Sequence, residues 1–467
     1  MRTSPRGRHA PTPPLSEADA EAHAHGICFK TGPPSRLGVE LEWLVRDGRD
    51  PALAVDHERV MAALAPLMTP GSLPGEGRLT IEPGGQVELS SAPAAGIGPC
   101  VAAACADLTA LRQAARAAGL VLVGQGTDPH RPPRRILQLP RYRAMEEFFD
   151  RSGPWGRLMM CSTASVQVCV DAGDEGSGPS GYRWRWRLLH AIGPLLVAAF
   201  ANSPLLRGRP SGWKSTRQAI WARLDPSRTS PPVGAEPSTG PSTGHSPGAA
   251  AGPPAAHPGA ADPRAAWAAY ALDAKVMCVR RPAPAAWTAP PGLTFREWVR
   301  GAGERQPTSG DLTYHLSTLF PPVRPQGHLE VRVIDAQPGD DWIVPAAVVG
   351  ALLDDPAAAE TAMAAAECIW RAPGPGAPRA TPWLRAARYG PADAQLALAS
   401  ERCFEAAGAA LGRLGAPLPV RQAVAAYRDR YVARRRCPAD EQLEQYRNSS
   451  GPPSGDHLPA TPLEDPP

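Results

Sequence analysis

Carboxylate side chains recur at alternating positions in segments that are otherwise apolar. The segment RLTIEPGGQVELSS (78–91) carries Glu82, Gln86 and Glu88. If it forms a strand, a sharp turn at 83–85 and a second strand, Gln86 and Glu88 lie on the same face of a sheet. Ionised carboxylates grouped on a packed sheet are costly unless a cation compensates them, because burial and like-charge repulsion both oppose ionisation. The segment therefore indicates a metal site.

Further segments place polar groups on a sheet face in the same way. In RLGVELEWLV, Glu40 and Glu42 alternate with apolar residues, which puts them about 7 Å apart along a strand. Gln167 lies on the polar face of RLMMCSTASVQVCVD, and Glu330 lies between His328 and Arg332 on the polar face of a third such strand. The expected cluster of metal-binding carboxylates is Glu40, Glu42, Glu82, Glu88 and Glu330.

Magnesium fits this cluster best, because it prefers oxygen ligands, takes one or two carboxylates per ion and completes its shell with water and phosphate oxygens. Several carboxylates therefore imply more than one Mg²⁺ together with ATP. The alternative is that each glutamate lies on a solvated sheet face. A single pair of alternating glutamates more often lies on a solvated face than in a metal site. The presence of three strands with polar faces makes the solvated-face interpretation less probable here.

Arginines near these strands supply the matching cations. Arg217, Arg324 and Arg332 could hold phosphates or a substrate carboxylate through forked hydrogen bonds, although surface ion pairing is the simpler interpretation of each. The chain contains neither a GxxxxGK[ST] loop nor a GxSxG elbow, so these motifs support neither nucleotide binding nor a serine nucleophile. Cys161 and Cys169 are expected to serve packing and not catalysis.

Composition limits the class of protein. The chain has 467 residues and a net charge of +4, which is too small to favour a nucleic-acid surface. Nine scattered cysteines without a CxxC pair, and an N-terminus without a signal pattern, predict a cytoplasmic protein. The longest apolar run is well short of a bilayer span, so no membrane association is expected.

The pattern of elements predicts an α+β protein. Polar-faced strands alternate with helical segments in the first two thirds of the chain, and from Trp342 onward the pattern is helical, which predicts helices packed on one face of a sheet. We expect a disordered arm over 1–25, although Ser16 could cap a short helix, and a single catalytic domain over 26–445. A Pro-rich loop at 226–263 and a tail at 446–467 are also predicted to be disordered.

Five motifs occur in the order found in the glutamate-cysteine ligase type 2 family, which the chain resembles over roughly residues 36 to 435. They are GVELEWLV, RLTIEPGGQVELSS, RLMMCSTASVQVCVD, FANSPLLRGRPSGWKSTRQAIW and FPPVRPQGHLEVRVIDAQPGDDW. The nearest resemblance is to an actinobacterial branch that serves ergothioneine biosynthesis. The family implies a glutamine-synthetase-like fold with a curved antiparallel sheet, and ligation of L-glutamate to L-cysteine with ATP and Mg²⁺ through γ-glutamyl phosphate.

The resemblance also implies roles for particular residues. Glu40, Glu42, Glu82, Glu88 and Glu330 would be metal ligands, Arg217, Arg324 and Arg332 would stabilise phosphate charge, and Gln86, Gln167, Lys214 and Arg217 would bind the cofactor. Three alternatives stay open: a related carboxylate-amine ligase with another amine substrate, a non-catalytic metal- or thiol-binding regulator, and an RNA-binding protein that uses YRWRWR (182–187).

Overall fold

One antiparallel sheet organises the chain. The structure is a computed structural model of the whole chain and describes residues 15–237, 262–371, 381–450, 463, 464 and 466. The main path of the sheet runs in the order β2, β3, β1, β6, β10, β9, and β4 and β5 pair with the ends of β1. The strands are β1 (Arg36–Asp47), β2 (Arg78–Ile81), β3 (Val87–Ser90), β4 (Ala94–Ala95), β5 (Leu120–Val123), β6 (Ser165–Asp171), β9 (Val323–Pro325) and β10 (His328–Asp335).

Alternation along β1 gives the sheet an apolar and a polar face. Val39, Leu41 and Trp43 are buried in the main core, whereas Glu40 and Glu42 point to the other side and stay partly exposed. A register slip of one residue would exchange the two faces, so burial of the apolar set fixes the register.

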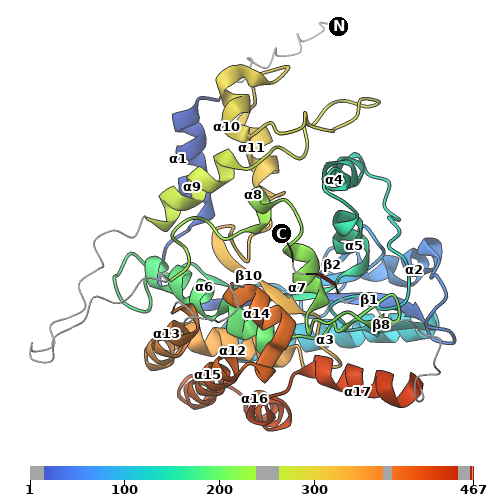
Figure 1. Cartoon of the computed structure of the whole chain (residues 1–467), viewed down its shortest axis with the longest axis vertical. Helices are drawn as coiled ribbons and strands as arrows, with labels where there is room; N and C mark the ends of the chain where they lie inside the picture. Colours follow the sequence, from blue (N-terminus) through green and yellow to red (C-terminus); the bar gives the residue numbers. More distant parts are fainter. Residues whose placement is uncertain (1–14, 238–261, 372–380, 451–462, 465, 467) are drawn as a thin grey trace, which may run out of the picture.

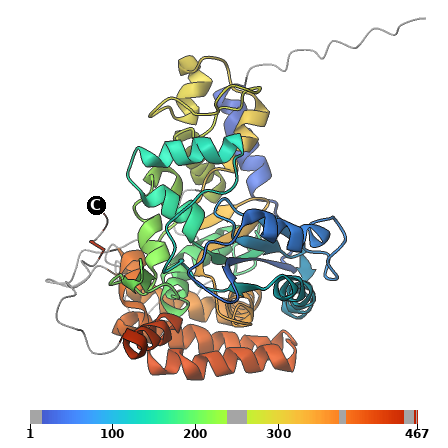
Figure 2. The ribbon, with the colours of Figure 1, turned by 90° about the vertical axis from the view of Figure 1, so that its right-hand side faces the viewer.

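Helices cover the apolar face in two layers (Figure 1). The helices α3 (Ile97–Ala117), α6 (Tyr182–Ala199) and α12 (Ile343–Asp354) pack directly on the strands. Beyond them lie α13 (Pro356–Trp370), α15 (Ala394–Arg413) and α16 (Leu418–Arg430), which form the base of the molecule in Figure 2 with α17 (Pro438–Ser450). The α+β class with an antiparallel sheet and an outer helical layer is therefore confirmed.

Shorter helices stand on the polar side of the sheet. They are α4 (Pro140–Asp150), α5 (Trp155–Ser162) and α7 (Thr216–Trp221), and α14 (Pro382–Tyr389) packs against α6 and α7. A separate group projects at the top of Figure 1 and contains α1 (Glu17–Cys28), α9 (Pro263–Asp273), α10 (Phe295–Glu297) and α11 (Ser309–Leu316). The remaining elements are α2 (His57–Leu64), α8 (Pro226–Thr229), the hairpin of β7 (Leu205–Leu206) and β8 (Arg209–Pro210), and the short turns η1 (Ala65–Leu67), η2 (Trp298–Ala302), η3 (Gly390–Ala392) and η4 (Val432–Arg434).

The structure differs from the predicted domain limits at three places. Ser16 caps α1, and this helix packs against α9, so residues 15–25 are part of the folded body. The first part of the Pro-rich loop is also ordered, because Arg228 is fully buried and donates to the carbonyl of Thr318. In the tail, α17 continues to Ser450 and Leu463 donates to the Ser211 carbonyl. The other predicted disorder, at 1–14, 238–261 and 451–462, lies outside the described residues.

The residues proposed for RNA binding are largely unavailable. YRWRWR forms the first turns of α6, where Tyr182, Arg185 and Trp186 are fully buried. Arg185 donates to the backbone carbonyls of Asp171 and Leu353, so its guanidinium is engaged inside the folded protein. The RNA-binding alternative is therefore wrong for this segment. Among the described residues, no helix is long and apolar enough to cross a membrane.

Candidate active site

A cavity of about 340 Å³ lies on the polar face of the sheet, between the strands and the short helices α4, α5 and α7. Its lining includes nine of the residues singled out from the sequence, which are Glu40, Glu42, Glu82, Gln86, Glu88, Gln167, Arg217, Arg332 and, from β9, Arg324. The structure thus brings acidic and basic candidates into one concave space.

Strand pairing brings the carboxylates together. Glu42 on β1 stands directly opposite Glu88 on β3, and Glu40 stands opposite Gln167 on β6. Like charges in directly opposed positions of an antiparallel pair destabilise a sheet. When Glu42 and Glu88 are both ionised, their repulsion therefore destabilises the folded sheet.

The environment of the four cavity glutamates favours their neutral forms. Burial raises the pKa of Glu40 to about 8, and the charges of Glu330 and Glu88 act in the same direction. Burial and the charge of Glu42 raise the pKa of Glu88 to about 7. The pKa of Glu82 is raised well above its usual value by burial and by Glu88 and Glu42, and burial also raises that of Glu42. A cation in the cavity would reverse this effect.

Hydrogen bonds hold two of these carboxylates in place and leave two open. Glu42 accepts from the backbone N–H of Ser165 at 2.8 Å and from the Gln167 amide at 3.1 Å. Glu88 accepts from the hydroxyls of Thr80 and Ser90, each at 3.2 Å. Within the described part of the chain, the carboxylates of Glu40 and Glu82 have no hydrogen-bond donor.

Arg217 is the most deeply buried cation of the cavity. Its side chain is 3 % exposed, and one terminal nitrogen donates to the Arg332 carbonyl at 2.8 Å. Its Nε and its other terminal nitrogen have no hydrogen-bond partner among the described residues, although Asp335 lies 3.9 Å away. Unpaired buried donors cost free energy, so this guanidinium is well prepared for an anionic ligand.

Glu330 differs from the other predicted metal ligands. Arg324 donates to both of its carboxylate oxygens, at 2.7 and 3.0 Å, and Arg332 and Gln326 also donate to it. Burial alone would raise its pKa, but the charges of Arg324 and Arg332 outweigh burial and hold it at about 2. Arginines engage the oxygens of Glu330, unlike those of the other four glutamates, so its predicted role as a metal ligand stays a prediction.

Two predicted cofactor-binding residues have internal partners. Lys214 does not line the cavity and forms an ion pair with Asp440 of α17, so the structure separates it from the site. Gln86 lines the cavity, but its amide donates to the carbonyls of Met160 and Thr163 and accepts from the backbone N–H of Gly84. Gln86 therefore fixes the turn that carries Glu82.

Sequence reasoning missed a second group of lining residues. Arg141 and Tyr142 reach the cavity from α4, and Trp221 and Phe320 lie beside Arg217 and Arg332. Arg141 donates to the hydroxyl and carbonyl of Ser317. No periodic pattern marks these residues, because helix packing and loops bring them to the cavity.

The donor set fits magnesium. In the described residues no group of three or more His, Cys, Asp and Glu side chains is arranged as a ready-made metal cage. Mg²⁺ does not require such a cage, since it is held by one or two carboxylates together with water and phosphate oxygens. Glu40, Glu42, Glu82 and Glu88 supply oxygen ligands, and a bound cation would offset the burial that raises the pKa of each.

Comparisons with known proteins agree with this chemistry. Residues 36–456 match the family model described as glutamate-cysteine ligase family 2. The chain is 40% identical to the glutamate-cysteine ligase EgtA of Mycobacterium tuberculosis over 432 residues, covering 91% of this chain and 89% of the relative. The EgtA of Mycolicibacterium smegmatis is 39% identical over 445 residues, 94% of this chain and 93% of the relative.

Two further matches each cover about half of the matched protein. A chloroplastic glutamate-cysteine ligase of Medicago truncatula is 30% identical over 293 residues, 60% of this chain and 51% of the relative. Among solved structures, a bifunctional glutathione synthetase from Pasteurella multocida matches with a TM-score of 0.40 and 11% identity, covering 93% of this chain and 51% of that one.

Proposed function

The chain belongs to glutamate-cysteine ligase family 2, and we propose that it joins the γ-carboxylate of L-glutamate to the amino group of L-cysteine with consumption of ATP. The product is γ-glutamylcysteine, formed through γ-glutamyl phosphate. One observation carries the proposal: four glutamates with raised pKa values share a single cavity with Arg217, two of whose guanidinium nitrogens have no hydrogen-bond partner among the described residues.

The reaction has two balanced steps. An oxygen of the glutamate γ-carboxylate attacks the γ-phosphorus of ATP, and the bond to ADP breaks. The amine of cysteine then attacks the acyl carbon, phosphate leaves with the transferred oxygen, and the amine gives up a proton. Neither step forms a bond to the protein, so the protein supplies position and charge.

Arg217 and the pair Arg324–Arg332 have different roles in this scheme. Arg217 has two nitrogens without a hydrogen-bond partner in the described part of the chain, so it suits the carboxylate or phosphate oxygens directly. Arg324 and Arg332 are held by Glu330, which fixes their positions and limits the net positive charge at the cavity edge. Arg332 also donates to Gln167, which in turn donates to Glu42. The arginines and glutamates therefore form one connected network.

Mg²⁺ would be held by Glu40, Glu42, Glu82 and Glu88 and would neutralise phosphate charge during transfer. Glu330 is left out of this set because its oxygens are engaged by arginines. We also infer a reducing cytoplasmic location, since all nine cysteines are free thiols. By analogy with the EgtA relatives, we place the product in ergothioneine biosynthesis.

The test is ADP release by the purified chain with single components omitted. We expect release only when ATP, Mg²⁺, L-glutamate and L-cysteine are all present. Release that continues when cysteine is replaced by other amines would identify a broader carboxylate-amine ligase. No release under any condition, with Mg²⁺ still bound, would identify a non-catalytic metal-binding protein.

A further inference from the structure

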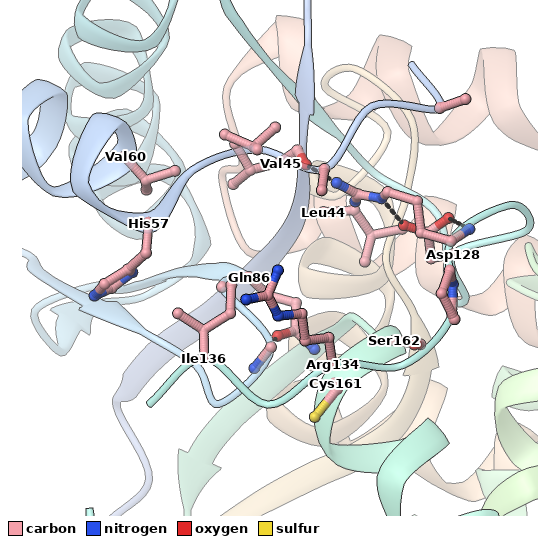
Figure 3. Close-up of a pocket in the computed structure, with 17 residues that line it drawn as sticks. Leu44, Val45, His57, Val60, Gln86, Asp128, Arg134, Ile136, Cys161 and Ser162 are labelled. Atoms are coloured by element: carbon pink, nitrogen blue, oxygen red, sulfur yellow. Dashed lines mark hydrogen bonds and ion pairs between the residues drawn. The ribbon is translucent and has the colours of Figure 1, made fainter. Parts of the chain in front are cut away.

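A second cavity, of about 270 Å³, is lined in part by Gly84, Gly85 and Gln86 of the turn that follows Glu82, and Figure 3 shows the residues around it. The end of β1, the start of α2, the segment 128–136 and the end of α5 form its walls. It shares Gln86 with the active-site cavity, which is lined by Glu82 and Pro83 of the same turn. Its volume is close to the lower end of the range for small-molecule sites.

The walls combine an apolar surface with donors. Leu44, Val45, Val60 and Ile136 supply aliphatic side chains. His57 contributes an imidazole whose Nδ1 is buried without a hydrogen-bond partner among the described residues. A buried nitrogen of this kind is costly unless a ligand or water engages it.

The cavity also has a cation without a counter-ion. Arg131 is neutralised by Asp128 at 2.6 Å and donates to the Val45 carbonyl. Arg134 has neither a hydrogen bond nor an ion pair in the described part of the chain. Figure 3 shows its guanidinium turned in among the other labelled residues, with no dashed line to them. The cavity therefore has an excess of positive charge beside an apolar wall.

We propose that this cavity binds a small monocarboxylate with an apolar body and that its occupancy acts on the active site through the turn 82–86. The carboxylate would pair with Arg134, the apolar body would cover Leu44 and Ile136, and His57 would complete the donor set. Charge complementarity favours an anion, and the size of the cavity and its aliphatic wall favour a compact hydrophobic acid over a nucleotide.

Tight packing connects the cavity to the turn. A Cβ added at Gly84 would lie 2.3 Å from the Cys161 carbonyl oxygen, and one at Gly85 would lie 2.8 Å from Cδ1 of Ile136. The backbone N–H of Ile136 donates to the Pro83 carbonyl at 2.7 Å. A ligand that presses on Ile136 therefore acts on a segment hydrogen-bonded to the residue next to Glu82.

The binding test uses 3-phenylpropanoate as the probe and titration calorimetry of the full chain. We expect a Kd of about 0.1–1 mM, the range for a ligand of this size. Arg134→Gln removes the charge and Ala54→Trp adds a bulky ring to the lining, both at exposed positions, and each should weaken binding at least about tenfold. Arg116→Gln, an exposed arginine of α3 outside the cavity, is the matched control and should bind as the wild type does.

The outcomes separate clearly. Binding of the neutral amide, 3-phenylpropanamide, as tight as that of the acid would overturn the assignment of Arg134 as the anion site. Absence of binding at 10 mM probe, about ten times the weakest expected Kd, would overturn the proposal. Displacement of the probe by L-glutamate, with Ala54→Trp binding normally, would place the probe in the active site and also overturn it.

The coupling is tested by turnover at subsaturating Mg²⁺ with and without the probe. We expect at least about a twofold change in the wild type and in Arg116→Gln, and no change in Ala54→Trp, whose basal turnover should be normal. Binding without any change in turnover would overturn the coupling. Calorimetric binding does not depend on ligase activity, so failure of the proposed function would not be mistaken for failure of this site.

Discussion

Replacing Glu88 with Gln separates an electrostatic role from a structural one. The substitution keeps size and hydrogen-bonding capacity and removes one negative charge directly opposite Glu42. As a metal ligand, Glu88 should be needed for turnover, whereas the metal-free fold should gain stability when the charge is lost. The two effects have opposite signs, which makes the variant informative.

The magnitudes follow from the environment of Glu88. Loss of one electrostatic group in an active site costs roughly 2–4 kcal/mol, or about 30- to 1,000-fold in turnover. A carboxyl whose pKa rises from 4.5 to about 7 on folding costs up to about 3 kcal/mol when fully ionised. Because the folded-state pKa is the higher one, the contribution of Glu88 to wild-type stability is most favourable below pH 4.5 and is lost as pH rises through about 7.

The assay measures thermal melts of the metal-free protein and Mg²⁺-dependent ADP release on the same samples at pH 8. We expect Glu88→Gln to melt a few degrees higher than the wild type and to lose most of its turnover. Glu360→Gln, at an exposed position of α13, is the matched control and should change neither quantity. A Glu88→Gln protein with normal turnover at normal Mg²⁺ concentration, or one that melts lower, would refute this reasoning.

Three further predictions address the arginines and the thiols. Arg217→Lys should raise KM for glutamate or ATP at least about tenfold, since a buried ammonium cannot replace the forked donors; unchanged kinetics would remove Arg217 from the site. Glu330→Gln should destabilise the fold, by about 3–5 kcal/mol, because Arg324 loses a buried partner; a denaturation curve measures this, and a stability gain like that of Glu88→Gln would contradict it. Cys161→Ala and Cys169→Ala should keep measurable turnover because the acyl-phosphate route needs no thiol, and a folded but inactive variant would argue against that route.

Local geometry explains what the sequence could predict. Side-chain parity along a strand depends only on the backbone, so the shared orientation of Glu40 and Glu42, and of Gln86 and Glu88, follows from their spacing. The turn at 83–85 was likewise readable from Pro and Gly, and Gly85 adopts φ of +88°. These features predict most of the candidate site, because they depend on local backbone geometry alone.

Tertiary contacts explain what the sequence could not predict. Lys214 is a near neighbour of Arg217 in sequence, yet its partner Asp440 comes from α17 at the other end of the chain. The side chain of Glu330 lies on the expected face of the sheet. Its partner in the register of β9 is Arg324, which forms an ion pair with its carboxylate. Arg141 reaches the cavity only because α4 stands over the sheet.

Backbone breaks divide the region that the sequence predicts to be helical from Trp342 onward. The first division falls at Asp355, which caps α13 and precedes Pro356. The side chain of Asp355 accepts from the Ala358 N–H at 2.8 Å. Such an Asp-Pro pair ends one helix and begins the next.

Isotope transfer from glutamate tests the central claim most directly. L-glutamate labelled with ¹⁸O at both γ-carboxylate oxygens is incubated with the enzyme, ATP, Mg²⁺ and L-cysteine. If ligation proceeds through γ-glutamyl phosphate, each released phosphate carries one ¹⁸O and the amide of γ-glutamylcysteine keeps the other. Release of unlabelled phosphate together with γ-glutamylcysteine would contradict the proposed route.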